Sequence, residues 1–90
     1  MYFLRMRFNL LVPFDKKEDV KKEFKIKWDM DKKIWYYIGN ELPEGLEKYR
    51  EMVVDVPYED KDLFKKRFKS MRWNKEDKIW TMSKEEYLTI

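Results

Sequence analysis

The sequence predicts an α+β protein made of two tandem β-α-β-β repeats, which pack about a pseudo-twofold axis with their helices on one face of antiparallel hairpins. Three observations support this fold class. The chain matches itself at an offset of 44 to 45 residues, each half carries two tryptophans in register, and the first strand alternates between apolar and charged residues. We expect residues 1–45 and 46–90 to form the two repeats of one compact unit with a shared core.

The internal match runs through most of each half, and residues aligned by it are called equivalent below. The offset is 44 up to Lys69 and becomes 45 after one inserted residue near Ser70. The aligned segments are Val12-Pro13-Phe14 with Val56-Pro57-Tyr58, Lys17 with Lys61, Phe24-Lys25 with Phe68-Lys69, Ile26-Lys27-Trp28-Asp29 with Met71-Arg72-Trp73-Asn74, and Lys33-Ile34-Trp35 with Lys78-Ile79-Trp80.

Each repeat is expected to begin with a strand. Between Tyr2 and Val12 the apolar residues alternate with polar ones that include Arg5 and Arg7, so a strand would place the two kinds on opposite faces. Proline donates no ladder hydrogen bond, and Pro13 and Pro57 are therefore predicted to end the two strands. The inward residues of the shorter second strand are predicted to be Met52, Val54 and Val56.

A helix is expected to follow each strand. Asp15 is predicted to cap the first helix, with Glu18 three residues later, and Asp60 is predicted to cap the second. Apolar residues four positions apart would form the buried stripe of each helix, and Leu63 would add to the second stripe. These stripes are Val20 with Phe24, and Phe64 with Phe68.

A hairpin is expected to complete each repeat. A four-residue loop from Met30 to Lys33 would place Trp28 across from Trp35, and Lys27 opposite Tyr36 on the reverse face. The same alternation in the second hairpin would place Trp73 and Trp80 on one face and Arg72 on the other. Because the tryptophan face is apolar in both repeats, we expect it to be buried. The predicted core residues of the hairpins and helix ends are Trp28, Trp35, Trp73, Trp80, Phe24 and Phe68.

Short helical segments are expected after the hairpins. Residues 46–50 have the composition of one or two helical turns, and Ser83 with Glu86 forms a capping box for a short C-terminal helix.

The composition leaves little catalytic equipment. Cysteine and histidine are absent, which excludes thiol chemistry and the commonest neutral base and metal ligand. The densest acidic groups, Asp29 with Asp31 and residues 59–62, lie in turns or caps, where Asp is favoured for backbone reasons. We therefore expect no metal, no cofactor and no enzymatic activity.

Charge and hydropathy indicate a cytoplasmic protein, in the host cytosol if it is viral. The apolar N-terminus is interrupted by Arg5 and Arg7, so it does not read as a signal peptide or a membrane span. Lys and Arg outnumber Asp and Glu by only 21 to 18, spread evenly. A basic binding face must then come from the placement of the charges.

Both halves carry a pattern that resembles the domain of unknown function DUF5710. The matching residues are Val12-Pro13-Phe14, Lys17, Lys21, Lys27-Trp28-Asp29 and Lys33-Ile34-Trp35-Tyr36, and then Val56-Pro57-Tyr58, Lys61, Lys65, Arg72-Trp73-Asn74 and Lys78-Ile79-Trp80-Thr81. The resemblance implies a phage, plasmid or mobile-element origin and an accessory role with nucleic acid. It implies no catalytic residues.

Two surfaces could serve such a role. Exposed tryptophans stack on unpaired bases, but the parity of the hairpins favours a buried position for them. The reverse face of the strands combines charge with one aromatic ring, although it could equally be an ordinary solvated surface. Lys17 and Lys61 are expected to cover tryptophan edges with their methylene stems. The predicted nucleic-acid or partner-binding residues are Arg5, Arg7, Lys27, Tyr36 and Arg72, with Lys33 and Lys78 at the hairpin bases.

Two functions remain open on the sequence alone. The first is a nucleic-acid-binding accessory module for DNA or RNA. The alternative is a virus-encoded inhibitor of a host protein, such as a CRISPR or other defence nuclease, because aromatic and Met side chains suit protein interfaces. Homodimerisation through an edge strand is compatible with either, and no membrane partner is expected.

Overall fold

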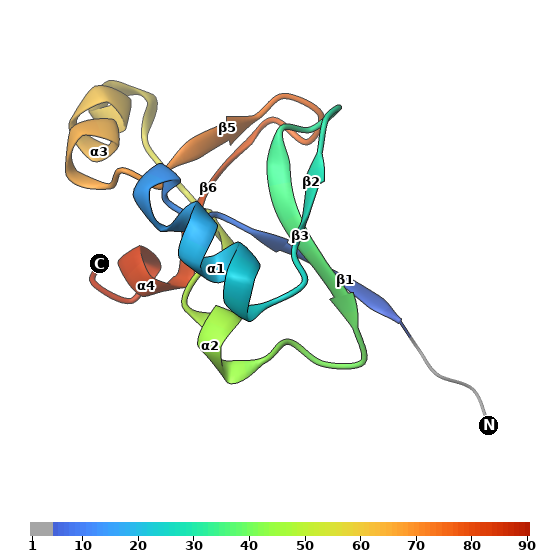
Figure 1. The fold of residues 1–90 in the computed structure, drawn as a ribbon. Helices are drawn as coiled ribbons and strands as arrows, with labels where there is room; N and C mark the ends of the chain where they lie inside the picture. The colour runs from blue at the N-terminus through green and yellow to red at the C-terminus, as the bar shows by residue number, and fades with distance from the viewer. Residues whose placement is uncertain (1–4) are drawn as a thin grey trace.

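The computed structural model describes residues 5–90 of the chain, and Figure 1 shows its arrangement. The part of the predicted first strand from Tyr2 to Leu4 lies outside these residues. The elements, in which η denotes a 3₁₀ helix, are β1 (Met6–Leu10), η1 (Phe14–Lys16), α1 (Lys17–Glu23), β2 (Lys27–Asp29), β3 (Ile34–Gly39), α2 (Glu44–Glu47), β4 (Glu51–Val54), η2 (Tyr58–Asp60), α3 (Lys61–Arg67), β5 (Arg72–Asn74), β6 (Ile79–Ser83) and α4 (Lys84–Tyr87).

The strands form two antiparallel sheets of three strands each. Their orders are β1-β3-β2 and β4-β6-β5, so the second strand of each hairpin is central and the first strand lies at an edge. This arrangement confirms the predicted α+β fold with a β-α-β-β unit in each half.

The hairpin register agrees with the prediction from loop length. Trp28 pairs with Trp35 and Lys27 pairs with Tyr36. The second hairpin pairs Trp73 with Trp80 in the same way. Pairs that face each other across neighbouring strands bring their side chains together on one face.

The starts of the two main helices differ from the prediction. Each strand ends three residues before its proline, and the proline begins a 3₁₀ turn instead. The Pro13 carbonyl accepts a hydrogen bond from Lys16 N at 2.9 Å. The Pro57 carbonyl accepts one from Asp60 N at 2.9 Å. Asp15 therefore lies inside η1. The predicted cap by Asp15 is wrong, because the N-cap of α1 is Lys16. Asp60 does occupy the N-cap of α3 as predicted, but its side chain makes no hydrogen bond there. The cap by Ser83 is confirmed, since its Oγ accepts from Glu86 N.

The predicted helix stripes are buried to different degrees. Val20 and Phe68 are buried, whereas Phe24 and Phe64 are partly buried against the same clusters. Leu63 is 66% exposed, so its assignment to the buried stripe is wrong. It lies one position, or about 100° around the helix, from the residue that faces the sheet.

The part of the chain that the structure describes has two hydrophobic cores instead of the expected shared one. The first consists of Leu10, Val20, Ile26, Leu46 and Tyr49. The second consists of Val54, Val56, Phe68, Met71 and Met82. Two residues that lie beyond the expected boundary after residue 45 thus complete the core of the first repeat.

Contacts between the repeats join equivalent elements. Strand β1 contacts β4, with a single bridge between Leu10 and Arg50. The two hairpin tips lie side by side, with Lys32 Nζ 3.8 Å from Glu76 Oε2. Helices α2 and α4 meet through Lys84 Nζ and Glu47 Oε1 at 2.8 Å. Like-with-like contacts of this kind are what a twofold arrangement produces.

Polar groups fill the junction between the two sheets. The Glu51 carboxylate accepts hydrogen bonds from Asn9 Nδ2 at 3.3 Å, Arg72 Nη1 at 3.3 Å and Thr81 Oγ1 at 2.9 Å. The reverse faces of the strands therefore meet each other in part, which explains why the cores stay separate. Within residues 5–90, every helix is too short or too polar to cross a membrane.

Candidate functional site

Each repeat carries an open groove between its hairpin and the turn that starts its helix. The first groove, in the first repeat, has a volume of about 1270 Å³, and the second groove, in the second repeat, about 820 Å³. Nine equivalent positions line both grooves, and five of them carry an aromatic or basic side chain in both repeats. These five are Phe14 and Tyr58, Lys17 and Lys61, Trp28 and Trp73, Lys33 and Lys78, and Trp35 and Trp80.

The first aromatic residue of each groove projects from the turn that follows the proline. Phe14 is 81% exposed and Tyr58 is 79% exposed. The ammonium group three residues later covers each ring: Lys17 Nζ lies 3.9 Å from the Phe14 centroid, and Lys61 Nζ lies 4.2 Å from the Tyr58 centroid. Positions three apart on a helical turn are neighbours, so this spacing brings the cation over the ring.

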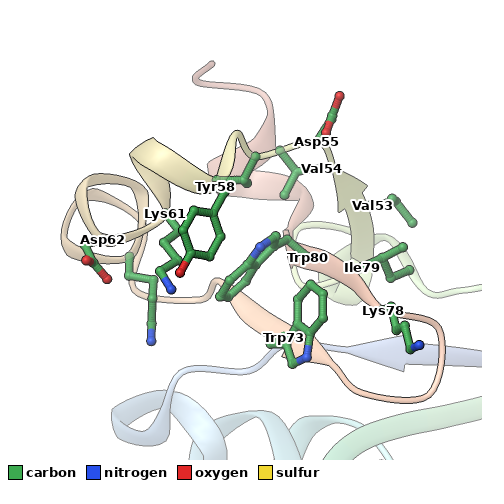
Figure 2. Close-up of a pocket in the computed structure, with 12 residues that line it drawn as sticks. Val53, Val54, Asp55, Tyr58, Lys61, Asp62, Trp73, Lys78, Ile79 and Trp80 are labelled. Atoms are coloured by element: carbon green, nitrogen blue, oxygen red, sulfur yellow. The ribbon is translucent and has the colours of Figure 1, made fainter.

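The tryptophan pair forms the opposite side of each groove. The ring centroids are 5.0 Å apart in the first repeat and 5.1 Å apart in the second. Figure 2 shows Tyr58, Trp73 and Trp80 gathered along the second groove, with Lys61 on one side of the rings and Lys78 on the other.

The tryptophans are only partly buried, which corrects the prediction that all four are core. Trp35 and Trp80 pack against the two cores. Trp28 is 43% exposed and Trp73 is 45% exposed, so these two are surface residues. The reason is topological, because β2 and β5 are edge strands and the core clusters form over the other two strands of each sheet.

Further lysines surround the pairs. Lys21 Nζ lies 5.8 Å from the Trp35 ring and Lys65 Nζ lies 5.9 Å from the Trp80 ring. Lys33 and Lys78 have φ values of 54° and 56°, in the left-handed region. A residue with a side chain loses roughly 1–2 kcal/mol in this region, so two equivalent lysines there are consistent with a need for the side chain.

Only part of the predicted reverse-face set lies together: Lys27 pairs with Tyr36 and Arg7 covers the Tyr36 ring, whereas Arg72 belongs to the other sheet. Arg7 Nη2 donates to Asp29 Oδ2 at 2.7 Å and its guanidinium lies 4.1 Å from the Tyr36 centroid. The N–H of Lys32 and the Arg7 guanidinium hold the pKa of the Asp29 carboxyl below its usual value. Arg7 thus has partners within its own repeat.

The remaining predicted binding residues are divided among different surfaces. Arg72 donates to Glu51 and to the Lys32 carbonyl while it borders the first groove. Arg5 and Lys27 are exposed away from the grooves. Lys33 and Lys78 line one groove each.

Sequence reasoning missed Phe14 and Tyr58 as surface residues and gave Lys17 and Lys61 only a packing role. The signal was present, since an aromatic residue directly follows each proline and a lysine follows it three residues later in both repeats. The grooves present ring faces and ammonium groups to solvent. Among residues 5–90, no group of three or more carboxylates is placed to hold a metal ion.

Comparison with known proteins identifies part of the chain. The model of the family described as "Domain of unknown function (DUF5710)" matches residues 7–50. Neither a curated protein nor a solved structure matches the chain significantly. The matched range ends just after Tyr49, the last residue of the first core. Residues 7–50 are therefore a DUF5710 domain, followed by a second similar β-α-β-β unit that the family model does not match.

Proposed function

We propose that this protein is a non-enzymatic accessory module that binds single-stranded nucleic acid in its two grooves. The observation that carries the proposal is the duplicated arrangement of exposed rings beside lysines. In the first groove these are Phe14 and Trp28 with Lys17 and Lys33, and the second groove repeats all four positions.

The chemistry of the grooves fits an unpaired strand. An exposed ring can stack on any base face, and such stacking contributes about 1–3 kcal/mol per base. Ammonium groups beside the rings neutralise phosphates and release bound counterions. A duplex keeps its base faces inside the stack, so it could use the lysines but not the rings.

A nucleic-acid strand suits these grooves better than a host protein does. Aromatic side chains are common in protein interfaces, but lysines are depleted there. Each groove places two lysines next to its rings, and a third lies near the inner tryptophan. The phage, plasmid or mobile-element setting that the family resemblance implies is compatible with this role.

Fluorescence anisotropy with labelled oligonucleotides tests the proposal. We expect an unpaired strand of about 16 nucleotides, the upper range for one small binding fold, to bind more tightly than a duplex of equal length. At about 50 mM salt its dissociation constant should lie below tens of micromolar, and the affinity should fall by a logarithmic slope of about 0.7 per phosphate contact as salt rises. Absence of binding, or a preference for the duplex, would refute the proposal and favour a protein partner.

Substitution of two exposed rings separates binding in the grooves from non-specific electrostatic attraction of nucleic acid to the protein. Replacing Phe14 and Tyr58 with Ala removes exposed rings that belong to neither core, so the protein should stay folded while affinity falls at least tenfold. Leu63→Ala is the matched control, because Leu63 is exposed, apolar and outside both grooves. An equal loss in the control would contradict the role of the rings.

A further inference from the structure

The two grooves differ in one respect that the repeat pattern does not predict. Among residues 5–90, all those that line the second groove come from the second repeat. The first groove is lined by both repeats, because Arg67, Lys69 and Arg72 border it together with Phe14 and Trp28. The segment from the end of α3 to the start of β5 therefore forms a wall of a groove whose rings belong to the other repeat.

We propose that the first groove is a composite site, in which Arg67 and Lys69 of the second repeat hold the phosphates of a strand whose bases stack on the rings of the first. This inference rests on the proposed function and assigns the second repeat a part in the binding site of the first. No residue of the first repeat from residue 5 onward lines the second groove, which is therefore the weaker of the two.

The inserted residue near the end of α3 fixes the wall in place. Ser70, which has no equivalent in the first repeat, donates its N–H to Glu86 Oε1 at 2.7 Å and its hydroxyl pairs with Ser83 Oγ at 3.1 Å. Ser83 is the N-cap of α4, and Glu86 lies within this helix. The loop is thus anchored to α4 by hydrogen bonds that the first repeat cannot copy.

Helix α4 in turn is attached to the first repeat. Lys84 Nζ contacts Glu47 Oε1 at 2.8 Å, and Glu85 N donates to the Lys48 carbonyl at 2.9 Å. A continuous set of hydrogen bonds therefore leads from α2 through α4 to Ser70. This holds the basic wall at a defined position relative to the first groove.

The second-repeat side of the first groove carries the carboxylates Glu85 and Glu86 as well as basic residues, and Arg67 and Lys69 are the cations available to a phosphate backbone. Arg67 and Lys69 are exposed, and neither forms an ion pair among the residues the structure describes. Their equivalents in the first repeat are Glu23 and Lys25, and neither borders the second groove. Where the second repeat has Arg67, the first repeat thus carries the opposite charge.

The test is a double variant, Arg67→Ala with Lys69→Ala, measured by anisotropy with an unpaired oligothymidylate. We expect the affinity to fall roughly three- to tenfold and the logarithmic salt slope to decrease by about 1.4, the value for two lost phosphate contacts. Lys25→Ala is the matched control, because it removes an equivalent exposed charge that borders neither groove, and it should leave the affinity unchanged. Thermal unfolding verifies that each variant is folded.

Combination with ring variants shows which groove the wall serves. The loss caused by Arg67→Ala with Lys69→Ala should largely disappear when Phe14→Ala has already disabled the first groove. It should persist when Tyr58→Ala has disabled the second. Equal losses in the two backgrounds, or an equal loss from Lys25→Ala, would overturn the composite site while leaving nucleic-acid binding intact. Failure of the unmodified protein to bind any unpaired strand would instead refute the proposed function.

Discussion

Trp28 lies directly across the first hairpin from Trp35, with ring centroids 5.0 Å apart and ring planes inclined by 63°. The two rings have different surroundings, since Trp35 packs against the first core and Trp28 is 43% exposed. Trp80 and Trp73 repeat this division in the second hairpin. In each repeat one ring thus supports the fold and its partner faces the groove.

Truncation of the two rings should separate stability from binding. Trp35→Ala removes packing from the core and should lower the free energy of unfolding by about 3 kcal/mol. Trp28→Ala removes mainly the contact between the rings and should cost about 1 kcal/mol. Urea unfolding measures both, and anisotropy should show that Trp28→Ala weakens binding of an unpaired strand in a protein that remains folded. A larger destabilisation from Trp28→Ala than from Trp35→Ala would contradict this division of roles.

The hairpins show how much the sequence could predict and where its information ended. The pairing of Trp28 with Trp35 followed from loop length and the strict alternation of side chains, both of which are local properties. Exposure did not follow, because it depends on which strand is central. That choice is made when β1 pairs with β3 and leaves β2 at the edge, which is a contact between distant segments. The alternation of side chains along a strand indicates which face each side chain occupies but not what covers that face.

The candidate site was limited by the same difficulty. Lys33 and Lys78 were identified because they lie at hairpin bases, and each does line a groove. Arg7 was assigned to a free face, but its carboxylate partner is 22 residues away in sequence, on the opposite edge strand of the same sheet. Charged residues that pair across a sheet cannot be told from free ones without the register of every strand.

Glu51 connects the two sheets, and its removal should destabilise the whole chain. Its carboxylate accepts hydrogen bonds from the buried Thr81 hydroxyl and from Arg72. Glu51→Ala leaves both donors without this acceptor, and we expect a loss of about 2 kcal/mol in the free energy of unfolding. Glu51→Gln keeps an oxygen for Thr81 and should lose less. Urea unfolding of the two variants measures the difference, and equal losses would show that Thr81 does not depend on this acceptor.

Asp29 should make stability depend on pH in the acid range. Its carboxylate accepts from the N–H of Lys32 and from Arg7, in that order of importance, and these donors lower its pKa. A carboxyl group whose pKa is lowered by folding contributes stability above its unfolded pKa, near 4, and loses it as the pH falls through the folded value. The free energy of unfolding should therefore decrease below about pH 4.

Asp29→Asn tests this contribution without removing the loop. Asn74 occupies the equivalent position and accepts from the two backbone N–H groups of Glu76 and Asp77, so an asparagine can hold this turn. We expect the variant to show a flatter loss of stability between about pH 4 and pH 2 in urea unfolding. It should not be fully flat, because contact with Lys84 also lowers the pKa of Glu47. A pH profile that matches the unmodified protein would show that Asp29 contributes nothing.

Replacing Lys33 and Lys78 with Gly should raise stability while it weakens binding, whereas truncation of a core residue lowers stability. Both have left-handed backbone conformations, which glycine adopts without steric cost. The double variant Lys33→Gly with Lys78→Gly relieves roughly 1–2 kcal/mol of strain at each position. The greater flexibility of glycine in the unfolded chain offsets part of this gain. We therefore expect the free energy of unfolding to rise by about 0.5–1 kcal/mol per site. The same change removes one ammonium group from each groove and should weaken binding of an unpaired strand several-fold. Lys33→Arg with Lys78→Arg keeps the charge and the strain, and it should leave both stability and affinity near their original values. Thermal unfolding and anisotropy measure the two effects, and a glycine variant that binds as tightly as the unmodified protein would show that these lysines do not contact the strand.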